Sequence, residues 1–349
     1  MIDVLSTMMG GDAENESIDV THYFQDILDD GEAISVPVRR NSGGSVISYR
    51  LKDLDIPTGG VIICDDSKNV RLRGFTTFDN LITTTGSIGA INIIRGEWGY
   101  AKNVWEHTGA HSIYQSVLDR MALVDSTMGV NFSASSGVTF EDVSVHRCDV
   151  GFQFAPTPAG GYIAANNMIG CQFFYNRMGI YLTGNKQKGG MTIHQCWFEF
   201  NNEGAIVVED YTYKLLIEGN YFERNGGSGY PDVSLSAPTV GSAVRSVTIA
   251  NNYFAAPHSG QICRVKNADR ASFKAFDNHA FVLAGSSGPQ IFAECGGVNA
   301  GGIDYEVRLA RNTLHSGTIR NYEVALYNKT GSQTVTSTEP ALDSQSVIF

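Results

Sequence analysis

Two glutamates and three large aromatic residues occupy matching places in three segments of the chain. Trp197 and Glu199 stand two residues apart in CWFEF, Tyr221 and Glu223 stand two apart in NYFER, and Tyr253 opens the same pattern in NYFAA. Two carboxyl groups about 5 Å apart suit a retaining glycosidase, and a separation of roughly 6.5 to 9.5 Å suits an inverting one. Aromatic rings stack on the apolar faces of sugars. The pattern therefore predicts a carbohydrate site with Glu199 and Glu223 as catalytic residues and Trp197, Tyr221 and Tyr253 as substrate-binding residues.

Further polar residues flank this set. We expect His194 and Glu218 to face outward beside each other, and Arg224 directly follows Glu223, so all three are predicted substrate-binding residues. Neighbouring carboxylates repel each other, and we therefore expect the pKa of one of them to be raised, as a general acid requires. Two other interpretations stay open: the stripe is an interface between subunits, or it is a solvated face.

Other acidic residues and two histidines are weaker candidates. Three acids fall in or near a predicted turn and are expected to be solvated: Glu203, Glu209 and Asp210. His107 and His111 lie in GEWGYAKNVWEHTGAHSIYQ, which we interpret as a loop inserted into the surrounding pattern. No third ligand accompanies these histidines, so the sequence predicts no metal site. No motif indicates a cofactor.

The candidate residues belong to a repeat. Six segments can be superimposed by their turn pattern: MALVDSTMG from Met121, VSVHRCDVG from Val143, CQFFYNRMG from Cys171, CWFEFNNEG from Cys196, NYFERNGGSG from Asn220 and NYFAAPHSG from Asn252. Their first residues lie 22, 28, 25, 24 and 32 positions apart. A period of roughly 20 to 50 residues is typical of a solenoid, whose units bury their apolar faces by stacking on one another.

Within each repeat, apolar residues alternate on both sides of a kink. The residues five and three positions before Cys196 and two after it are Met191, Ile193 and Phe198. A period of two on either side of a kink indicates two short strands facing one core. Several repeats place asparagine at the kink, where it tolerates left-handed backbone angles and can link its amide to neighbouring coils. These residues are Asn220, Asn252, Asn278 and Asn312, and a second polar position carries Asn176, Asn201 and Asn225.

LLIEGNYFERNGG and VTIANNYFAAPHSGQI resemble the repeat of right-handed, pectin-lyase-like β-helices, in which three short strands complete each turn. The resemblance implies an all-β protein, a single-stranded parallel β-helix (β-solenoid) over residues 21–326. The segment from Thr21 to Asp30 has apolar residues at helical spacing before Gly31, which predicts a short helix that caps the β-helix. We expect residues 1–20 to form a polar arm and residues 327–349 an extended tail.

The N-terminal region narrows the resemblance. FQDILDDGEAISVP followed by YRLKDLDIPTGGV is similar to the start of bacteriophage tailspike and tail-appendage β-helices. This resemblance implies a virion protein of the phage tail that acts outside the host cell on a bacterial surface polysaccharide, a capsule or O-antigen. It also implies a homotrimer whose N-terminal arm contacts other virion tail proteins.

Whether such a spike is an enzyme is left open by the sequence. As a polysaccharide depolymerase, it would be a glycoside hydrolase in preference to a lyase. One alternative is a non-catalytic structural or receptor-binding spike, and another is a free secreted polysaccharide lyase or hydrolase.

Composition argues against several classes of partner. The formal net charge is −11, with 25 Lys plus Arg against 36 Asp plus Glu, so the chain lacks the basic footprint that nucleic acids and anionic membranes require. No segment is apolar over the length of a membrane span, and the N-terminus does not read as a secretory signal. The six cysteines show no zinc-type spacing and are expected to be buried free thiols.

Overall fold

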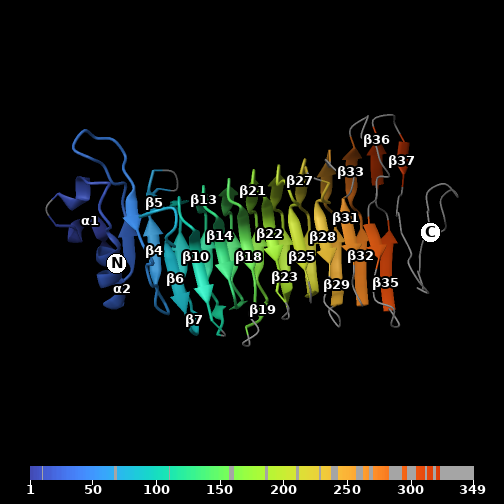
Figure 1. Cartoon of the computed structure of the whole chain (residues 1–349), viewed down its shortest axis with the longest axis horizontal. Helices are drawn as coiled ribbons and strands as arrows, with labels where there is room; N and C mark the ends of the chain where they lie inside the picture. The colour runs from blue at the N-terminus through green and yellow to red at the C-terminus, as the bar shows by residue number, and fades with distance from the viewer. Residues whose placement is uncertain are drawn as a thin grey trace. The chain divides into compact units, whose positions relative to one another are not determined.

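The computed structural model divides into two compact units. Figure 1 labels the helices and strands in chain order. The first unit is Met1–Asn166 with Gly170–Gln172, and the second is Asn167–Ile169 with Phe173–Phe349. The structure describes residues 1–9, 11–66, 69–109, 111–156, 161–184, 188–209, 212–227, 229–236, 243–256, 262–266, 270–282, 293–296, 304–310, 313–316 and 320–322. The predicted tail, 327–349, lies outside the described residues.

Each unit is a stack of coils in which short parallel strands form three faces, here called A, B and C. Face A of the first unit contains β1(Ile2–Asp3), β2(Ile34–Val36), β4(Val61–Cys64), β8(Asn92–Ile94), β12(Val117–Asp119) and β16(Thr139–Glu141), with the short β7(Ile88–Gly89), β11(Ile113–Tyr114), β15(Ser135–Ser136) and β19(Ile163–Ala164). Face B contains β3(Tyr49–Leu51), β5(Arg71–Gly74), β9(Glu97–Gly99), β13(Ala122–Val124) and β17(Ser144–His146). Face C contains β6(Ile82–Thr85), β10(Asn103–Thr108), β14(Met128–Phe132) and β18(Val150–Phe154).

The second unit repeats the same three faces. Face A contains β20(Asn167–Ile169), β23(Lys188–His194), β26(Thr212–Glu218), β29(Ala243–Ala250), β32(Arg270–Phe276) and β35(Asp304–Ala310). Face B contains β24(Trp197–Glu199), β27(Tyr221–Glu223), β30(Tyr253–Ala255), β33(His279–Val282), β36(Thr313–Ser316) and the antiparallel β37(Arg320–Tyr322), and β21(Gln172–Phe174) spans the division between the units. Face C contains β22(Met178–Leu182), β25(Ile206–Glu209), β28(Val233–Ser236), β31(Cys263–Lys266) and β34(Ala293–Gly296). The predicted parallel β-helix is confirmed.

Face B is bounded by two corners that each consist of one residue in the left-handed backbone conformation. In one coil of the second unit these residues are Gln195, with φ 54°, and Phe200, with φ 54°. In a coil of the first unit they are Arg120, with φ 52°, and Asp125, with φ 49°. The predicted kink is therefore present, but the left-handed residue is the one before the position that carries asparagine.

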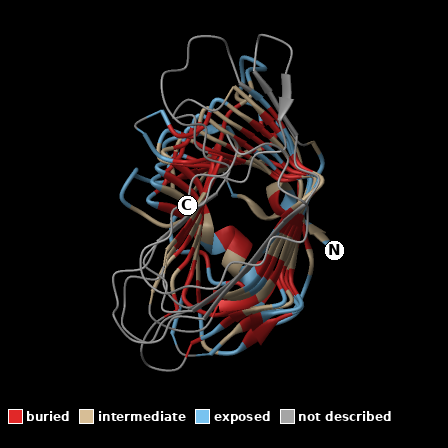
Figure 2. Cartoon of the chain, turned by 90° about the vertical axis from the view of Figure 1, so that its right-hand side faces the viewer, coloured by how far each residue is buried: buried red, intermediate tan, exposed pale blue. Residues whose placement is uncertain are grey.

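Inside the second unit, identical side chains stack from coil to coil. The rings of Phe198 and Phe222 are 5.0 Å apart and those of Phe222 and Phe254 are 4.6 Å apart, nearly parallel in both pairs. The Asn220 amide donates to Asn252 Oδ1 at 3.0 Å, which confirms the predicted amide link. In each unit the buried residues lie on the inner faces of the strands (Figure 2).

The N-terminal helix lies where it was expected, and the apolar residues that predict it are buried. Helix α2(Thr21–Asp29) buries Tyr23, Phe24, Ile27 and Leu28, and it stops where Gly31 adopts φ 74°. Two further short helices precede it, α1(Val4–Thr7) and η1(Asp12–Glu14).

Residues 1–9 and 11–20 lie against the first coils. The buried Arg39 donates to backbone carbonyl oxygens of Ala13 at 2.9 Å, Asn15 at 2.7 Å and Ser48 at 2.7 Å. Strand β1 pairs in parallel with β2. The segment thus covers the end of the first unit, and its attachment to a virion stays a prediction.

The inserted loop expected at residues 96–115 is not there. This segment contains β9, β10 and β11, which pair with the strands of neighbouring coils. Its aromatic residues misled the prediction, because Trp98 and Trp105 are core residues with relative exposures of 0% and 1%. Five cysteines are buried free thiols as expected: Cys64, Cys148, Cys171, Cys196 and Cys263. No helix within the described ranges combines the length and apolarity needed to cross a membrane.

Candidate functional site

Face B of the second unit carries a column of aromatic side chains, here called the ladder and consisting of Trp197, Tyr221 and Tyr253. These residues are register partners on β24, β27 and β30. The rings of Tyr221 and Tyr253 are stacked with centroids 5.6 Å apart, and Trp197 meets Tyr221 edge-on at 5.3 Å. Trp197 and Tyr253 are 42% and 43% exposed, so an apolar surface is available to a ligand.

Two glutamates form a second column beside the ladder. Glu199 and Glu223 are register partners, and adjacent strands in a sheet are about 4.8 Å apart. The Tyr221 hydroxyl donates to Glu223 Oε2 at 2.9 Å, and Arg224 Nε lies 3.8 Å from Glu223 Oε1. The predicted catalytic residues therefore lie together, and Tyr221 and Arg224 hold one of them in place.

Glu199 and Glu223 lie in different electrostatic environments. The pKa of Glu199 is raised, first by desolvation and then by the charge of Glu223, while Arg224 lowers it. The prediction of a raised carboxyl pKa is confirmed, although burial contributes more than like-charge repulsion. Burial and the hydrogen bond to Glu223 also raise the pKa of Tyr221 to about 12, which keeps this hydroxyl protonated as a donor.

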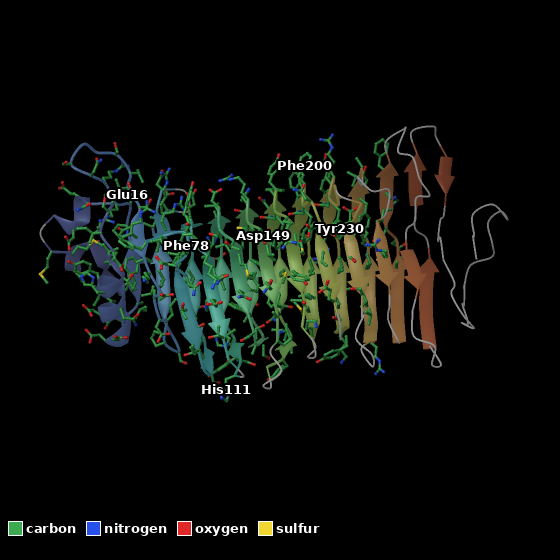
Figure 3. The ribbon with its side chains drawn as sticks, in the orientation of Figure 1. Glu16, Phe78, His111, Asp149, Phe200 and Tyr230 are labelled. Carbon is green, nitrogen blue, oxygen red and sulfur yellow. The ribbon has the colours of Figure 1, made fainter. Side chains whose placement is uncertain are left out.

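A second aromatic cluster at the corner after face B was not predicted. Tyr175 and Phe200 occupy the left-handed corner positions, and their rings stack 5.1 Å apart at an interplanar angle of 8°. The Arg224 guanidinium lies 5.5 Å from the centroid of the Phe200 ring. Tyr175 is 60% exposed. Figure 3 shows Phe200 near the upper edge of the view. The signal in the sequence is the aromatic residue at the fourth position after the kink, Tyr175 in one repeat and Phe200 in the next. The repeat pattern predicts a turn at this position.

His194 and Glu218 lie on face A, at the ends of β23 and β26. Their closest atoms, His194 Nδ1 and Glu218 Oε2, are 3.9 Å apart, as expected for outward neighbours. The left-handed residues Gln195 and Gly219 turn the chain between these two side chains and face B. The pair is therefore adjacent to the ladder in sequence but lies around a corner from it.

The competing acids are partnered within the fold. Glu203 Oε2 accepts a hydrogen bond from Arg177 at 2.5 Å, and Glu209 accepts one from the Tyr181 hydroxyl at 2.6 Å. Glu203 lies in a turn as expected, Glu209 ends β25, and both are half-buried with a specific partner. Asp210 lies outside the described residues.

His107 is a core residue that belongs to β10. Its ring nitrogens contact Thr84 Oγ1 at 3.0 Å and the backbone oxygen of His111 at 2.8 Å, and burial lowers its pKa. The His111 side chain is exposed at the edge of its coil (Figure 3). Across the described part of the chain, no group of three His, Cys, Asp or Glu side chains is arranged to hold a metal ion.

Comparisons with known proteins match the architecture. Residues 102–240 match the family described as "Right handed beta helix region". No match was found among curated protein sequences. An alginate lyase from Paenibacillus is 14% identical with a TM-score of 0.54, over 88% of this chain and 96% of its own.

Two further solved structures have the same fold. The A-module of a mannuronan C-5 epimerase from Azotobacter vinelandii is 13% identical with a TM-score of 0.60, over 97% of this chain and 99% of its own. The tailspike protein of E. coli bacteriophage HK620, solved with a pentasaccharide, is 10% identical with a TM-score of 0.51, over 90% of this chain and 66% of its own. At these identities the likeness shows the fold, a right-handed parallel β-helix.

Proposed function

We propose that this right-handed parallel β-helix protein binds a bacterial surface polysaccharide along face B of its second unit and acts as a phage tailspike or tail appendage. The observation that carries the proposal is the exposed ladder with two register-paired glutamates beside it. Trp197 and Tyr253 expose apolar ring surface on either side of Tyr221, which both of them contact, and the glutamates offer hydrogen-bond acceptors for sugar hydroxyls. A tailspike and two polysaccharide-acting enzymes among the similar structures support this substrate class.

The same site is equipped for hydrolysis. Glu199, with its raised pKa, is the proton donor to the glycosidic oxygen, and Glu223, held by Tyr221 and Arg224, is the carboxylate that attacks or stabilises the sugar cation. Glu199 and Glu223 are register partners on adjacent strands, whose backbones lie about 4.8 Å apart, and this spacing supports a retaining mechanism in preference to an inverting one. This division of roles makes hydrolysis the reaction we assign to the site.

Binding and cleavage are tested separately. Purified protein is incubated with a panel of bacterial capsules and O-antigens, and both retention on the polysaccharide and release of reducing ends are measured. Trp197→Ala should weaken binding to a recognised polysaccharide, while Glu199→Gln and Glu223→Gln should retain binding and lower cleavage by a factor of about 10² or more. Val143→Ala, a core change in the first unit, is the matched control.

The outcomes separate three functions. Binding without cleavage by the unaltered protein identifies a receptor-binding spike and removes the hydrolase assignment. Full cleavage by both glutamine variants places the catalytic residues elsewhere. If no polysaccharide is retained and the ladder becomes buried on self-association, face B is a subunit interface and the proposal fails.

A further inference from the structure

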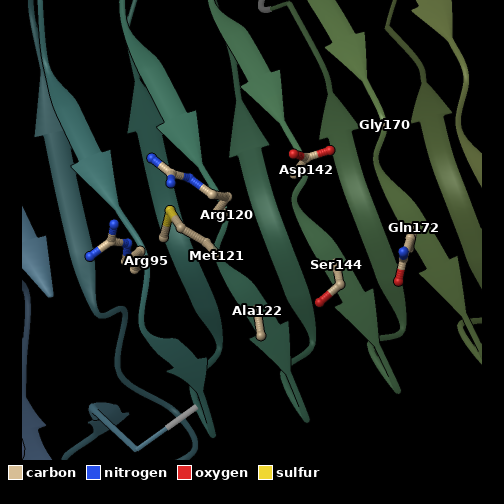
Figure 4. Close-up of a pocket in the computed structure, with 8 residues that line it drawn as sticks. All are labelled: Arg95, Arg120, Met121, Ala122, Asp142, Ser144, Gly170 and Gln172. Atoms are coloured by element: carbon tan, nitrogen blue, oxygen red, sulfur yellow. The ribbon is translucent and has the colours of Figure 1, made fainter. Parts of the chain in front are cut away.

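Arginines occupy several of the left-handed corners that bound face B. Arg120 lies at the corner before face B in the first unit, where it borders a hollow of about 360 Å³ that Ala122 and Arg95 also line (Figure 4). Arg147 lies at the corner after face B in the first unit, and Arg224 lies at the same corner in the second unit. The partners of these arginines differ in a way that bears on the glutamate pair.

In the first unit, Arg120 and Arg147 are held by carboxylates. Arg120 Nε donates to both carboxylate oxygens of Asp119, at 2.9 and 2.8 Å. Arg147 donates through Nε and Nη2 to the two carboxylate oxygens of Asp125, at 2.6 and 2.7 Å. Asp125 occupies the corresponding corner of the preceding coil. Because paired hydrogen bonds fix the plane of a guanidinium group, an acid of the fold determines the orientation of each of these arginines.

Arg224 has different neighbours. At the corner of the preceding coil stands Phe200, and the Arg224 guanidinium lies 5.5 Å from the centroid of its ring, within the range of about 6 Å for a cation–π contact. Arg224 Nε lies 3.8 Å from Glu223 Oε1, which is longer than a hydrogen bond. The corner of the following coil is Ala256, whose methyl group offers neither a charge nor a ring. The contact with the Phe200 ring therefore determines where the guanidinium lies beside Glu223.

The Phe200 ring is itself held in place. It stacks on Tyr175, with ring centroids 5.1 Å apart and an interplanar angle of 8°. The Phe200 N–H donates to the backbone oxygen of Glu223 at 3.1 Å, and the Tyr175 N–H donates to that of Glu199 at 3.0 Å. Left-handed corners favour glycine, asparagine and aspartate, so the backbone does not account for aromatic residues at these two corners.

We propose that Phe200 is a positioning residue of the glutamate pair and acts through Arg224. The inference rests on the hydrolytic function proposed for face B. The ring holds the guanidinium beside Glu223, and the positive charge so placed lowers the pKa of Glu199 against the opposing effect of burial. An exposed ion pair of this length orders its side chains only weakly, so without the ring the guanidinium extends into solvent.

Carboxyl NMR titration of the full chain without polysaccharide tests the role of the ring. Phe200→Leu keeps an apolar side chain but removes the aromatic face, so Glu199 should titrate at higher pH. Phe200→Tyr keeps the face and should titrate like the unaltered protein. The titratable and charged groups close to Glu199 are Tyr221, Glu223 and Arg224, and the variants change none of them.

Combined variants separate an effect through Arg224 from an effect of apolar burial. In protein that carries Arg224→Ala, Phe200→Leu should leave the Glu199 titration unchanged, because the group through which the ring acts is gone. The upfield ring-current shift of the Arg224 side-chain protons should disappear in Phe200→Leu and persist in Phe200→Tyr. Tyr100→Leu removes a ring from the same corner of the first unit and is the matched control, which should not alter the Glu199 titration.

Activity measurements separate this inference from the function on which it rests. With a polysaccharide that the protein cleaves, Phe200→Leu should lower kcat about threefold and leave KM unchanged, as expected when one exposed charge contact is lost. If the unaltered protein cleaves no polysaccharide, the hydrolase assignment fails, and the NMR results alone decide what places Arg224. The role of Phe200 is overturned if Glu199 titrates normally in Phe200→Leu, or if Phe200→Leu still shifts the titration when Arg224 is already alanine.

Discussion

Face B has the same backbone in both units but opposite outer surfaces. In the first unit the outward column contains Ala122 and Ser144, and the space above them is a hollow bordered by arginines. In the second unit the equivalent column contains Trp197 and Tyr221, whose rings fill that space with an exposed ladder. One scaffold therefore supplies a charged depression or an apolar platform, depending on the size of one side chain per coil.

The interiors of the two units differ in how regularly their side chains repeat from coil to coil. The second unit stacks phenylalanine on phenylalanine and asparagine on asparagine, as at Phe198, Phe222 and Asn220. At the matching inward positions the first unit has unlike residues, including Trp98 and Leu123. The second unit thus repeats side chains both inside its coils and on its outer face, whereas the first unit has unlike residues at both kinds of position.

The largest expected effect is on the asparagine column. Asn220→Ala removes the acceptor of the Cys196 N–H at 2.8 Å and the donor to the Ile193 carbonyl at 3.0 Å, and it breaks the link to Asn252. Unpartnered buried polar groups cost about 1–3 kcal/mol each, so we expect a loss of about 4 kcal/mol in the free energy of unfolding.

Denaturant unfolding measures this loss against a matched change. Val143→Ala alters the same coil position in the first unit, where no amide column exists, and should cost about 2 kcal/mol by loss of apolar burial. Equal costs at the two positions would show that the amide column adds nothing specific to the second unit.

The next effect concerns Asp232, a fully buried residue of the second unit. Burial raises its pKa to about 8, although the Asn225 backbone and side-chain amides hydrogen bond to its carboxyl group. The group is ionised in the unfolded chain above its ordinary pKa of about 3.9, so the folded state must take up a proton. Stability should therefore fall as the pH rises from about 4 through 8.

Asp232→Asn tests this pH dependence. The amide keeps an acceptor for Asn225 and cannot ionise, so the variant should be more stable at pH 7 by on the order of 3 kcal/mol and should lose the slope between pH 4 and 8. The measurement is the free energy of unfolding at pH 5, 7 and 9. An unchanged slope would mean that another group is responsible for it.

A smaller effect is expected when the outward side chains of the two surfaces are changed in size. Trp197→Ala should weaken polysaccharide binding about tenfold, and it should change the free energy of unfolding by less than about 0.5 kcal/mol, as expected for exposed positions. Ala122→Trp should likewise preserve stability while it converts the hollow to a surface like the ladder. If either substitution unfolds its unit, the outward residue is required for folding, and the two surfaces cannot be exchanged on the same backbone.

The smallest effect is on the pKa of Glu199. Arg224 lowers this pKa, so Arg224→Ala should raise it further, and because Glu199 acts as the proton donor, the alkaline limb of the pH–rate profile or a carboxyl NMR titration should move to higher pH. Arg147 occupies the corresponding corner in the first unit and is paired with Asp125. Its replacement by alanine is the control and should leave the Glu199 pKa unchanged.

The sequence predicted those features that follow from the regular spacing of its apolar residues. A period of two determines which side of each strand faces the core, and it predicts that Trp197, Glu199 and Tyr221 face outward. It could not predict the order of residues 1–20, because that order depends on Arg39 and the backbone carbonyl groups around it. It also missed the hollow, since alanine and serine carry no chemical signal until their larger counterparts in other coils are compared with them.

The single-residue corners set where this chain tolerates change in length. Left-handed residues stand five apart on either side of face B, as at Gln195 and Phe200, while the spacing of whole repeats varies from 22 to 32 residues. Every insertion is therefore accommodated elsewhere in the coil, and the outward columns keep their alignment. A designer who grafts new loops between faces C and A could diversify recognition without disturbing either surface of face B.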